Sequence, residues 1–324
     1  MLDATRLRVL VAIARHGSVT GAAQALNYAQ PSISHHMARL ESETGAKLME
    51  RAGRGIRLTD AGRLLAERAE EILGRLDAAE AELAAHLGLR QEKVRLAAFG
   101  SALGTLAAAA SSALRAERSV TDVSLVQAEP AEAVRMLRVG EVDVALVFRY
   151  LYEADRTADA SRGAPIDRAG DLPDGEDLHY LPLLEEPVYL ITHAAGLPAP
   201  RASTHSAPGS ILAPYAGHRW IAGCERCQDV LIRLCRSAGF SPNIAVTTDD
   251  YIAAQALVAA GLGAAILPEL ALRALRHPGV TATRLPGTRR QVLAITYGGP
   301  PEPQAATALI SALTSAAALF HGTS

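Results

Sequence analysis

The sequence predicts an α/β protein in three parts: a winged helix-turn-helix over residues 1–58, a long linker helix over 59–90 and a two-lobed α/β domain over 91–324. Three observations predict this order. The N-terminal part holds three short amphipathic helical segments followed by a hairpin pattern. Between Arg63 and Leu87 there is no proline and a single glycine. From Val94 onward, short apolar strands alternate with helical segments, which is typical of α/β domains.

Size and composition favour a globular chain with more than one domain. Its 324 residues exceed what one hydrophobic core usually organises. Hydrophobic residues make up 49% of the chain, enough for packed cores. The net charge of −2 is unevenly distributed: eight basic and four acidic side chains precede position 59, a net +4, which leaves −6 for the remainder. This asymmetry indicates that the N-terminal part contacts a polyanion.

The sequence shows no pattern for export or membrane insertion. The N-terminus lacks a charged-then-apolar leader, and no uninterrupted apolar run of about 20 residues occurs. The three cysteines, Cys224, Cys227 and Cys235, are too few and too clustered for a disulfide framework, which fits a reducing compartment. We therefore expect a cytoplasmic protein.

Local signals delimit the first three helices. The first is expected over 5–15, with Gly17 at the position of a C-cap glycine. Ser18 can cap a second, short helix with a small apolar face. Pro31 fits the first turn of a third helix, because its missing N–H needs no partner there.

The third helix has two distinct faces. On a helical wheel, Ile33, Met37 and Leu40 gather on the inner face. The opposite face is small, polar or cationic, which suits a helix that enters a DNA major groove about 12 Å wide. The residues of this outer face are Pro31, Ser32, His35, Ala38, Arg39 and Ser42.

A hairpin with clustered arginines is expected next. Two short strands over 47–51 and 55–58 flank a turn, and Arg51, Arg54 and Arg57 lie in this hairpin. Such a wing can lie along phosphates or reach into a minor groove. The alternative is a helix-turn-helix that docks protein instead of DNA.

Several separated sequence blocks resemble the LysR-type transcriptional regulators. They are GSVTGAA at 17–23, QPSIS at 30–34, LE at 40–41, ER at 50–51 and LTDAG at 58–62. The chain departs from the family pattern at Ala29, where a capping serine is common, and at the pair His35 and His36, which could also be solvated surface residues. The resemblance implies DNA contacts from Gln30, Pro31, Ser32, Ser34, His35 and Arg39 on the third helix, and from Arg54 in the wing.

A long helix is expected to follow the wing, capped by Thr59 with Asp60 at its positive end. At 1.5 Å per residue it would be about 40 Å long. Its apolar stripe extends beyond what a small winged domain can cover, which predicts a dimer. The resemblance implies an antiparallel linker-helix dimer, with a dimer of dimers as the larger assembly. The alternative is a helix that lies on its own chain. The stripe consists of Leu65, Ile72, Leu76, Ala79 and Leu83.

From Val94 onward, strands alternate with helices: over 94–148 this alternation predicts a parallel sheet covered on both faces, and a second alternating set is expected over 188–267. The resemblance assigns this region to a two-lobed effector-binding domain similar to periplasmic solute-binding proteins. Lobe I is expected over 91–178 and 268–324, and lobe II over 179–267. A loop is expected around 155–177. Two separate strands are expected near the end of the chain, over 280–285 and 291–297.

A small-molecule site is expected at the carboxyl ends of these strands, because ligands of open α/β sheets bind there. The alternatives are helix capping for Ser101, Asp249 and Asp250, and a core position for Phe148. The candidate effector-binding residues are Gly100, Ser101, Ala102, Gln127, Glu129, Phe148, Gly223, Cys224 and Thr248.

The predicted function is therefore sequence-specific regulation of transcription, with a small-molecule effector bound between the lobes. The C-x-x-C of Cys224 and Cys227 leaves two alternatives, a redox-sensing regulator or, with Cys235 and His218, a metal site. The C-terminal domain alone would also permit a solute-binding protein. An enzyme is not expected, since the chain has no G-x-S-x-G, no H-E-x-x-H and no phosphate-binding loop ending in Gly-Lys-Ser/Thr. We predict no catalytic residues, no metal and no cofactor.

Overall fold

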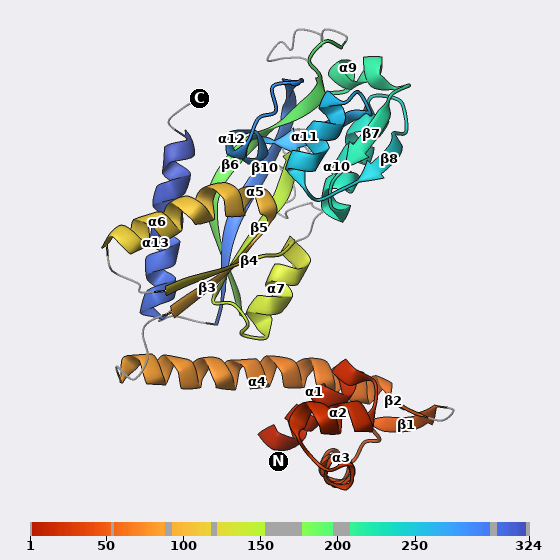
Figure 1. The fold of residues 1–324 in the computed structure, drawn as a ribbon, viewed down its shortest axis with the longest axis vertical. Helices are drawn as coiled ribbons and strands as arrows, with labels where there is room; N and C mark the ends of the chain where they lie inside the picture. Colours follow the sequence, from red (N-terminus) through yellow and green to blue (C-terminus); the bar gives the residue numbers. More distant parts are fainter. Residues whose placement is uncertain are drawn as a thin grey trace, which may run out of the picture. The chain divides into compact units, whose positions relative to one another are not determined.

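The computed structural model describes residues 2–52, 55–87, 93–117, 122–152, 177–196, 208–298 and 303–321 (Figure 1). The chain divides into two compact units. The smaller comprises residues 1–91 with 138–141, and the larger comprises 92–137 with 142–324.

The smaller unit begins with three helices whose ends follow local signals in the sequence. They are α1 (Ala4–His16), α2 (Val19–Leu26) and α3 (Gln30–Thr44). Gly17 ends α1 in the left-handed conformation, with φ 64°, which glycine adopts at little cost. The Ser18 hydroxyl caps α2 by accepting from the N–H of Gly21 at 2.9 Å. The expected caps are therefore confirmed.

The inner faces of these helices form one core. Ile33, Met37 and Leu40 of α3 are completely buried, as the helical wheel predicts. They pack with α1 and with Ala69 of α4 (Asp60–His86). Burying an aliphatic side chain of this size contributes about 1.5–3 kcal/mol, so this core holds the outer face of α3 in a fixed orientation.

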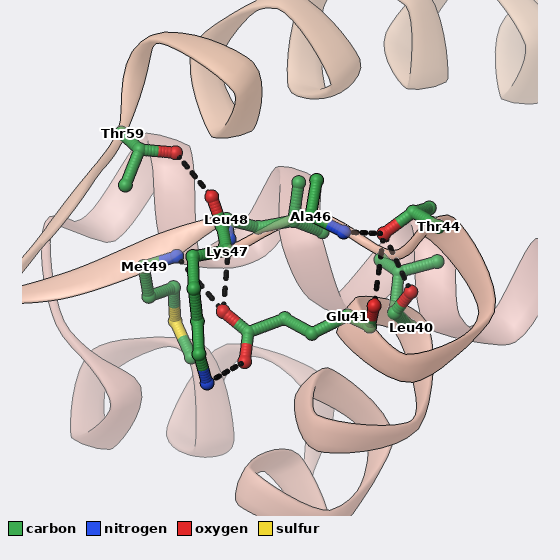
Figure 2. Close-up of polar contacts among 8 residues, drawn as sticks. All are labelled: Leu40, Glu41, Thr44, Ala46, Lys47, Leu48, Met49 and Thr59. Atoms are coloured by element: carbon green, nitrogen blue, oxygen red, sulfur yellow. Dashed lines mark hydrogen bonds and ion pairs between the residues drawn. The ribbon is translucent and has the colours of Figure 1, made fainter.

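The wing is a two-stranded antiparallel hairpin, β1 (Met49–Ala52) and β2 (Gly55–Leu58). Glu41 of α3 fixes its base, as Figure 2 shows. One carboxylate oxygen of Glu41 accepts from the N–H of Leu48 at 2.8 Å and from that of Met49 at 3.2 Å, and the other accepts from Lys47 at 3.1 Å. These contacts join the C-terminal half of α3 to the start of the hairpin.

Glu41 holds its charge because of these donors. Burial raises the pKa of Glu41, but the N–H groups of Leu48 and Met49 and the Lys47 ammonium outweigh it, so the pKa lies below its usual value. The carboxylate is therefore ionised at neutral pH and can accept all three hydrogen bonds.

The long helix α4 carries exposed apolar side chains. The Thr59 hydroxyl caps it by accepting from the N–H of Gly62 at 3.0 Å. Ile72, Leu76 and Leu83 are 42%, 43% and 59% exposed in this single chain. Among the described residues, no helix combines the length and apolar content needed to cross a membrane.

A single mixed sheet runs through the larger unit, with the order β4-β3-β5-β10-β6-β9-β7-β8 among the described residues. One parallel set comprises β3, β4 and β5, and the other comprises β7, β8 and β9. The strands are β3 (Lys93–Ala98), β4 (Asp122–Gln127), β5 (Val144–Tyr152), β6 (Leu178–His193), β7 (Arg219–Ala222), β8 (Asn243–Thr247), β9 (Ala264–Pro268) and β10 (Val280–Tyr297).

Helices cover both faces of this sheet (Figure 1). Leu96 and Ala97 are successive residues of β3, both fully buried, and they belong to different hydrophobic clusters. The helical segments of the larger unit are α5 (Gly100–Ala102), the π-helical η1 (Leu103–Ala107), α6 (Ala108–Glu117), α7 (Pro130–Arg138), α9 (Pro208–Leu212), the 3-10 turn η2 (Ala213–Tyr215), α10 (Glu225–Ser237), α11 (Tyr251–Ala259), α12 (Glu269–Ala274) and α13 (Gln304–His321).

The parallel pairing expected for the first three strands is confirmed, because β3 pairs in parallel with both β4 and β5. The long strands β6 and β10 run antiparallel to each other and to their neighbours β9 and β5. One expectation about strands is wrong, because the segments 280–285 and 291–297 are one strand, β10. The turn-forming pair Pro286 and Gly287 makes an irregularity instead of an end, since the pairing register with β6 shifts between Leu285 and Arg289 and Gly287 has a φ of 71°. The expected loop around 155–177 lies almost entirely outside the described residues.

We predict that Glu41→Ala loosens the wing without unfolding α3. The two N–H groups lose their shared acceptor, which should cost the smaller unit about 1–3 kcal/mol. Hydrogen exchange measured by mass spectrometry should become faster over residues 45–58. Because the pKa of Glu41 is lowered on folding, its contribution is present above the pKa of a free glutamate and is lost as the pH falls through the folded value.

The difference between wild type and Glu41→Ala should therefore shrink in acid. Glu67→Ala, which removes an exposed carboxylate from α4, is the matched control and should leave exchange in the wing unchanged. Equal exchange rates in wild type and Glu41→Ala at pH 7 would show that Glu41 does not hold the wing.

Candidate functional site

The outer face of α3 presents the predicted DNA-contacting residues to solvent. This face lies opposite Ile33, Met37 and Leu40, which are buried in the core. The predicted contacts on α3 are all exposed, and they are Gln30, Pro31, Ser32, Ser34, His35 and Arg39.

Most of these side chains make few contacts within the protein, so they can contact an external partner. The Arg39 side chain is 62% exposed and meets Glu43 only at 3.7 Å, a solvent-screened pair on the same helix. The Ser34 hydroxyl donates to the Gln30 carbonyl at 3.3 Å. His36, in contrast, stacks on Tyr28 with 5.9 Å between ring centroids and is less exposed than His35.

The wing of the same unit carries further exposed cations. Arg51 and Arg57 are exposed, and Arg57 bonds Glu50 across the hairpin at 2.7 Å. Arg54, the predicted wing contact, lies outside the described residues. Its role stays a prediction.

A second candidate site is a cavity in the larger unit, which encloses about 560 Å³ including its open mouth. It lies at the carboxyl ends of parallel strands, as the ligand-site rule for α/β sheets predicts. Two of the predicted residues, Ala102 and Gln127, are not among its lining: Ala102 is fully buried and the Gln127 side chain is exposed. The predicted residues that line it are Gly100, Ser101, Glu129, Phe148, Gly223, Cys224 and Thr248.

The structure adds lining residues that sequence reasoning missed. Arg290 comes from the middle of β10, where the sequence offered no strand end, and Tyr251 comes from the first turn of α11. The sequence marks Cys227 by its spacing to Cys224, and the structure adds it to the cavity lining. Asp250 caps α11, as expected, and Asp249 lines the cavity beside it.

A buried ion pair holds Arg290, one of the residues that line the cavity. Arg290 and Glu186 are 3% and 2% exposed, and the Arg290 Nε donates to Glu186 Oε1 at 2.6 Å. The other Glu186 oxygen accepts from the N–H of Leu270, at the start of α12, at 2.6 Å. The Arg290 guanidinium also donates to the Ser101 hydroxyl at 3.0 Å. Ser101 is therefore a partner of Arg290 and not the helix cap considered from the sequence.

Aromatic rings enclose the Arg290 charge. The guanidinium carbon lies 4.7 Å from the ring centroid of Phe99 and 4.9 Å from that of Phe148. Burial lowers the pKa of Arg290, but Glu186 more than compensates, so the pKa lies above its usual value. The guanidinium is therefore charged and satisfied by Glu186, Ser101 and the two rings.

The cavity lining also contains two thiols and a carboxyl group. The Sγ atoms of Cys224 and Cys227 are 2.8 Å apart, and the Tyr150 hydroxyl donates to Cys227 Sγ at 3.8 Å. Glu129 lies beside Cys224, and burial raises the pKa of this carboxyl group. Among the described residues, no group of three metal-ligating side chains comes together.

We predict that Arg290→Met destabilises the larger unit, because it leaves the Glu186 carboxylate buried without its cation. Removing one partner of a buried pair typically costs about 3–5 kcal/mol. Trp220 is the only tryptophan of the chain and is fully buried in this unit, so its fluorescence during urea unfolding reports on this unit alone.

The double variant Arg290→Met/Glu186→Leu should recover part of the loss, since no unpaired charge remains. If Arg290→Met were as stable as wild type, the ion pair would not support the cavity.

Comparisons with known proteins identify both units. Residues 4–63 match the profile described as "Bacterial regulatory helix-turn-helix protein, lysR family", and residues 166–318 match the "LysR substrate binding domain". Together the two profiles cover most of the chain.

Curated relatives and solved structures agree with these matches. The regulator ClcR of Pseudomonas putida is 28% identical over 298 residues, 90% of each chain. A probable cat1 operon transcriptional activator of Acinetobacter lwoffii is 33% identical over 144 residues, 44% of this chain and 47% of its own length. The crystal structure of CbnR, a LysR family transcriptional regulator, superposes with a TM-score of 0.62 at 22% identity, covering 98% of this chain and 99% of that one, which shows a shared fold. The chain therefore belongs to the LysR family of bacterial transcriptional regulators.

Proposed function

We propose that this regulator reads an operator sequence with the outer face of α3 and responds to a small molecule held in the cavity of the larger unit. The observation that supports DNA reading is the separation of α3 into a buried apolar face and an exposed polar one. Six candidate base- or phosphate-contacting residues share the exposed face. Such a regulator acts in the cytoplasm, and its role is binding rather than catalysis, in keeping with its relatives, which are transcriptional regulators.

The chemistry of the exposed face suits base recognition. Gln30 can pair with adenine through its amide, and Arg39 can donate to guanine or to a phosphate. Smaller hydrogen-bond donors and acceptors are provided by Ser32, Ser34 and His35. Their spacing along one helix matches the requirement that a recognition helix lie in the major groove.

The exposed stripe of α4 supports a homodimer. Ile72, Leu76 and Leu83 would lose water contact against the same helix of a second copy, and a helix of 27 residues provides enough length for such a seam. A dimer presents two copies of α3 to two half-sites, and dimers can pair into a dimer of dimers. A solved relative with the same fold, CbnR, is described in complex with its target DNA.

The cavity walls come from both parallel sets of the sheet, which suits a ligand-responsive site. Gly100 and Phe148 belong to the side of β3 and β5, and Gly223 and Thr248 belong to the side of β7 and β8. A molecule that contacts both sides binds some arrangements of the two sides more tightly than others. This difference in binding free energy sets how far the molecule can shift the population of DNA-binding states.

We expect Arg39→Ala to weaken binding to the protein's own upstream intergenic DNA by about ten-fold, because it removes a charged donor from the exposed face of α3. Mobility-shift titrations at several salt concentrations measure this loss. A lower salt dependence with unchanged sequence preference would assign Arg39 to a phosphate.

Arg236→Ala is the matched control, because it removes an exposed arginine from α10 of the larger unit. It should bind as wild type does. Equal binding by Arg39→Ala and wild type would remove α3 as the reading element.

We further expect Gly100→Leu to block the cavity while preserving the fold. A Cβ at Gly100 would meet its nearest neighbours, Gln127 and Tyr251, at 3.6 Å and 3.8 Å, which is ordinary contact, and the longer side chain would extend into the cavity. A metabolite at about 100 times its dissociation constant stabilises wild type by about 2.7 kcal/mol. In thermal-shift measurements, Gly100→Leu should lose this stabilisation.

Gly217→Leu places the same side chain at an exposed site where a Cβ meets nothing within 4 Å. It should retain the shift. If Gly100→Leu retained it as well, the effector would bind elsewhere.

A further inference from the structure

The charged groups that line the cavity are unfavourable for an anionic ligand. Glu129 and Asp249 both line it, and Arg290 is the only basic side chain among the described residues of the lining. The Arg290 guanidinium already donates to the Glu186 carboxylate at 2.6 Å and to the Ser101 hydroxyl at 3.0 Å. An anion in this cavity would therefore meet two acidic side chains and one cation that is already paired.

The surroundings of Glu129 do not stabilise its negative charge. Burial is the largest cause that raises the pKa of this carboxyl group, and the charge of Asp249 raises it further. A hydrogen bond from Cys224 and the charges of Arg290 and Arg226 lower the pKa but do not compensate. A cation bound beside Glu129 would favour the ionised carboxylate, so the two would stabilise each other.

Helix capping does not account for Asp249. The N-cap of α11 is the next residue, Asp250, whose carboxylate accepts from the N–H groups of Ile252 and Ala253 at 2.8 Å and 3.1 Å. Asp249 is exposed, lines the cavity and acts electrostatically on Glu129. Because Glu129 follows β4 and Asp249 follows β8, a cation between them would contact both parallel sets of the sheet.

Apolar side chains make up much of the remaining lining. They include the ring of Phe148 and, from β9, Ile266, Leu267 and Pro268. The volume of about 560 Å³, including the open mouth, falls in the range of about 300–1,000 Å³ that is typical of small-molecule sites. These walls favour a ligand whose body is apolar, because binding removes both apolar surfaces from water.

We propose that the cavity binds an effector of one chemical class, a small organic cation in which an ammonium group is attached to an apolar body. The ammonium group donates to Glu129 and Asp249, and the apolar body packs against Phe148 and Ile266. This assignment rests on the proposed function, because it takes the cavity as the effector site. Since the two carboxylates follow strands of different parallel sets, the bound cation favours arrangements in which these sets lie close together.

Two probes with the same ring and the same spacer test the charge preference. 2-Phenylethylamine ends in an ammonium group, and 3-phenylpropionate ends in a carboxylate. Saturation-transfer NMR titrations with the full-length protein at pH 7 give the two dissociation constants. The amine should bind at least about ten-fold more tightly, as expected for hydrogen bonds between charged groups. Equal binding of the two probes, tighter binding of the carboxylate or no binding of either would overturn the proposal.

The double variant Glu129→Gln/Asp249→Asn removes both charges with little change in side-chain size. It should bind the amine about ten-fold more weakly than wild type and bind the two probes about equally. The matched control is Asp122→Asn/Glu132→Gln, which changes the net charge by the same amount at two carboxylates outside the cavity lining. It should keep the wild-type preference. The same preference in Glu129→Gln/Asp249→Asn would overturn the assignment of these two carboxylates.

Failure of this proposal and failure of the proposed function give different results. Gly100→Leu should abolish amine binding, whereas Gly217→Leu should retain it. If a metabolite of another class gave a thermal shift that Gly100→Leu loses, the cavity would remain the effector site and the ammonium assignment would be wrong. If the amine bound selectively but left the mobility shift of the upstream DNA unchanged, the ammonium site would stand and the effector role would be wrong.

Discussion

The buried ion pair between Arg290 and Glu186 is the constraint on which the cavity depends. Removing both charges from water is costly, and the cost is offset only when every donor and acceptor finds a partner. Here the partners come from four elements: β10 supplies Arg290, β6 supplies Glu186, α12 supplies the N–H of Leu270 and α5 supplies Ser101. These elements are consequently held in one arrangement. Apolar side chains of similar volume would stabilise the fold equally well. The main effect of the ion pair is therefore to fix the positions of these four elements, not to add to the free energy of unfolding.

The smaller unit rests on a different principle. Its core is apolar and follows the helical period, so the buried face of α3 could be predicted from the spacing of Ile33, Met37 and Leu40. Its helix ends could also be predicted, because Gly17, Ser18 and Thr59 act on backbone groups within four residues of themselves. Where a contact spans more of the chain, prediction failed: nothing in the sequence indicated that the Glu41 carboxylate would accept from Leu48 and Met49.

The difference between local contacts and contacts from distant parts of the chain also explains which parts of the cavity could be predicted. The rule that ligands lie beyond the carboxyl ends of parallel strands located Gly100, Glu129, Gly223 and Thr248. It could not locate Arg290, which projects from the middle of an antiparallel strand and meets partners 104 and 189 residues away. The strand itself was divided at Pro286 and Gly287, because a turn-forming pair and an irregularity inside a long strand have the same local sequence.

Arg290 acts both on the structure of the cavity and on the electrostatic field inside it. Its charge is neutralised by Glu186 on one side, yet it still contributes to lowering the pKa of Cys227 on the other. A cation that is locked by a carboxylate cannot turn toward a ligand without leaving that carboxylate buried and unpaired, which would cost several kcal/mol. Its field in the cavity is therefore permanent, whether or not a ligand is bound. Arg290 therefore fixes the shape of the site and adds to the field at Cys227, whose pKa is lowered first by the hydrogen bond from Cys224.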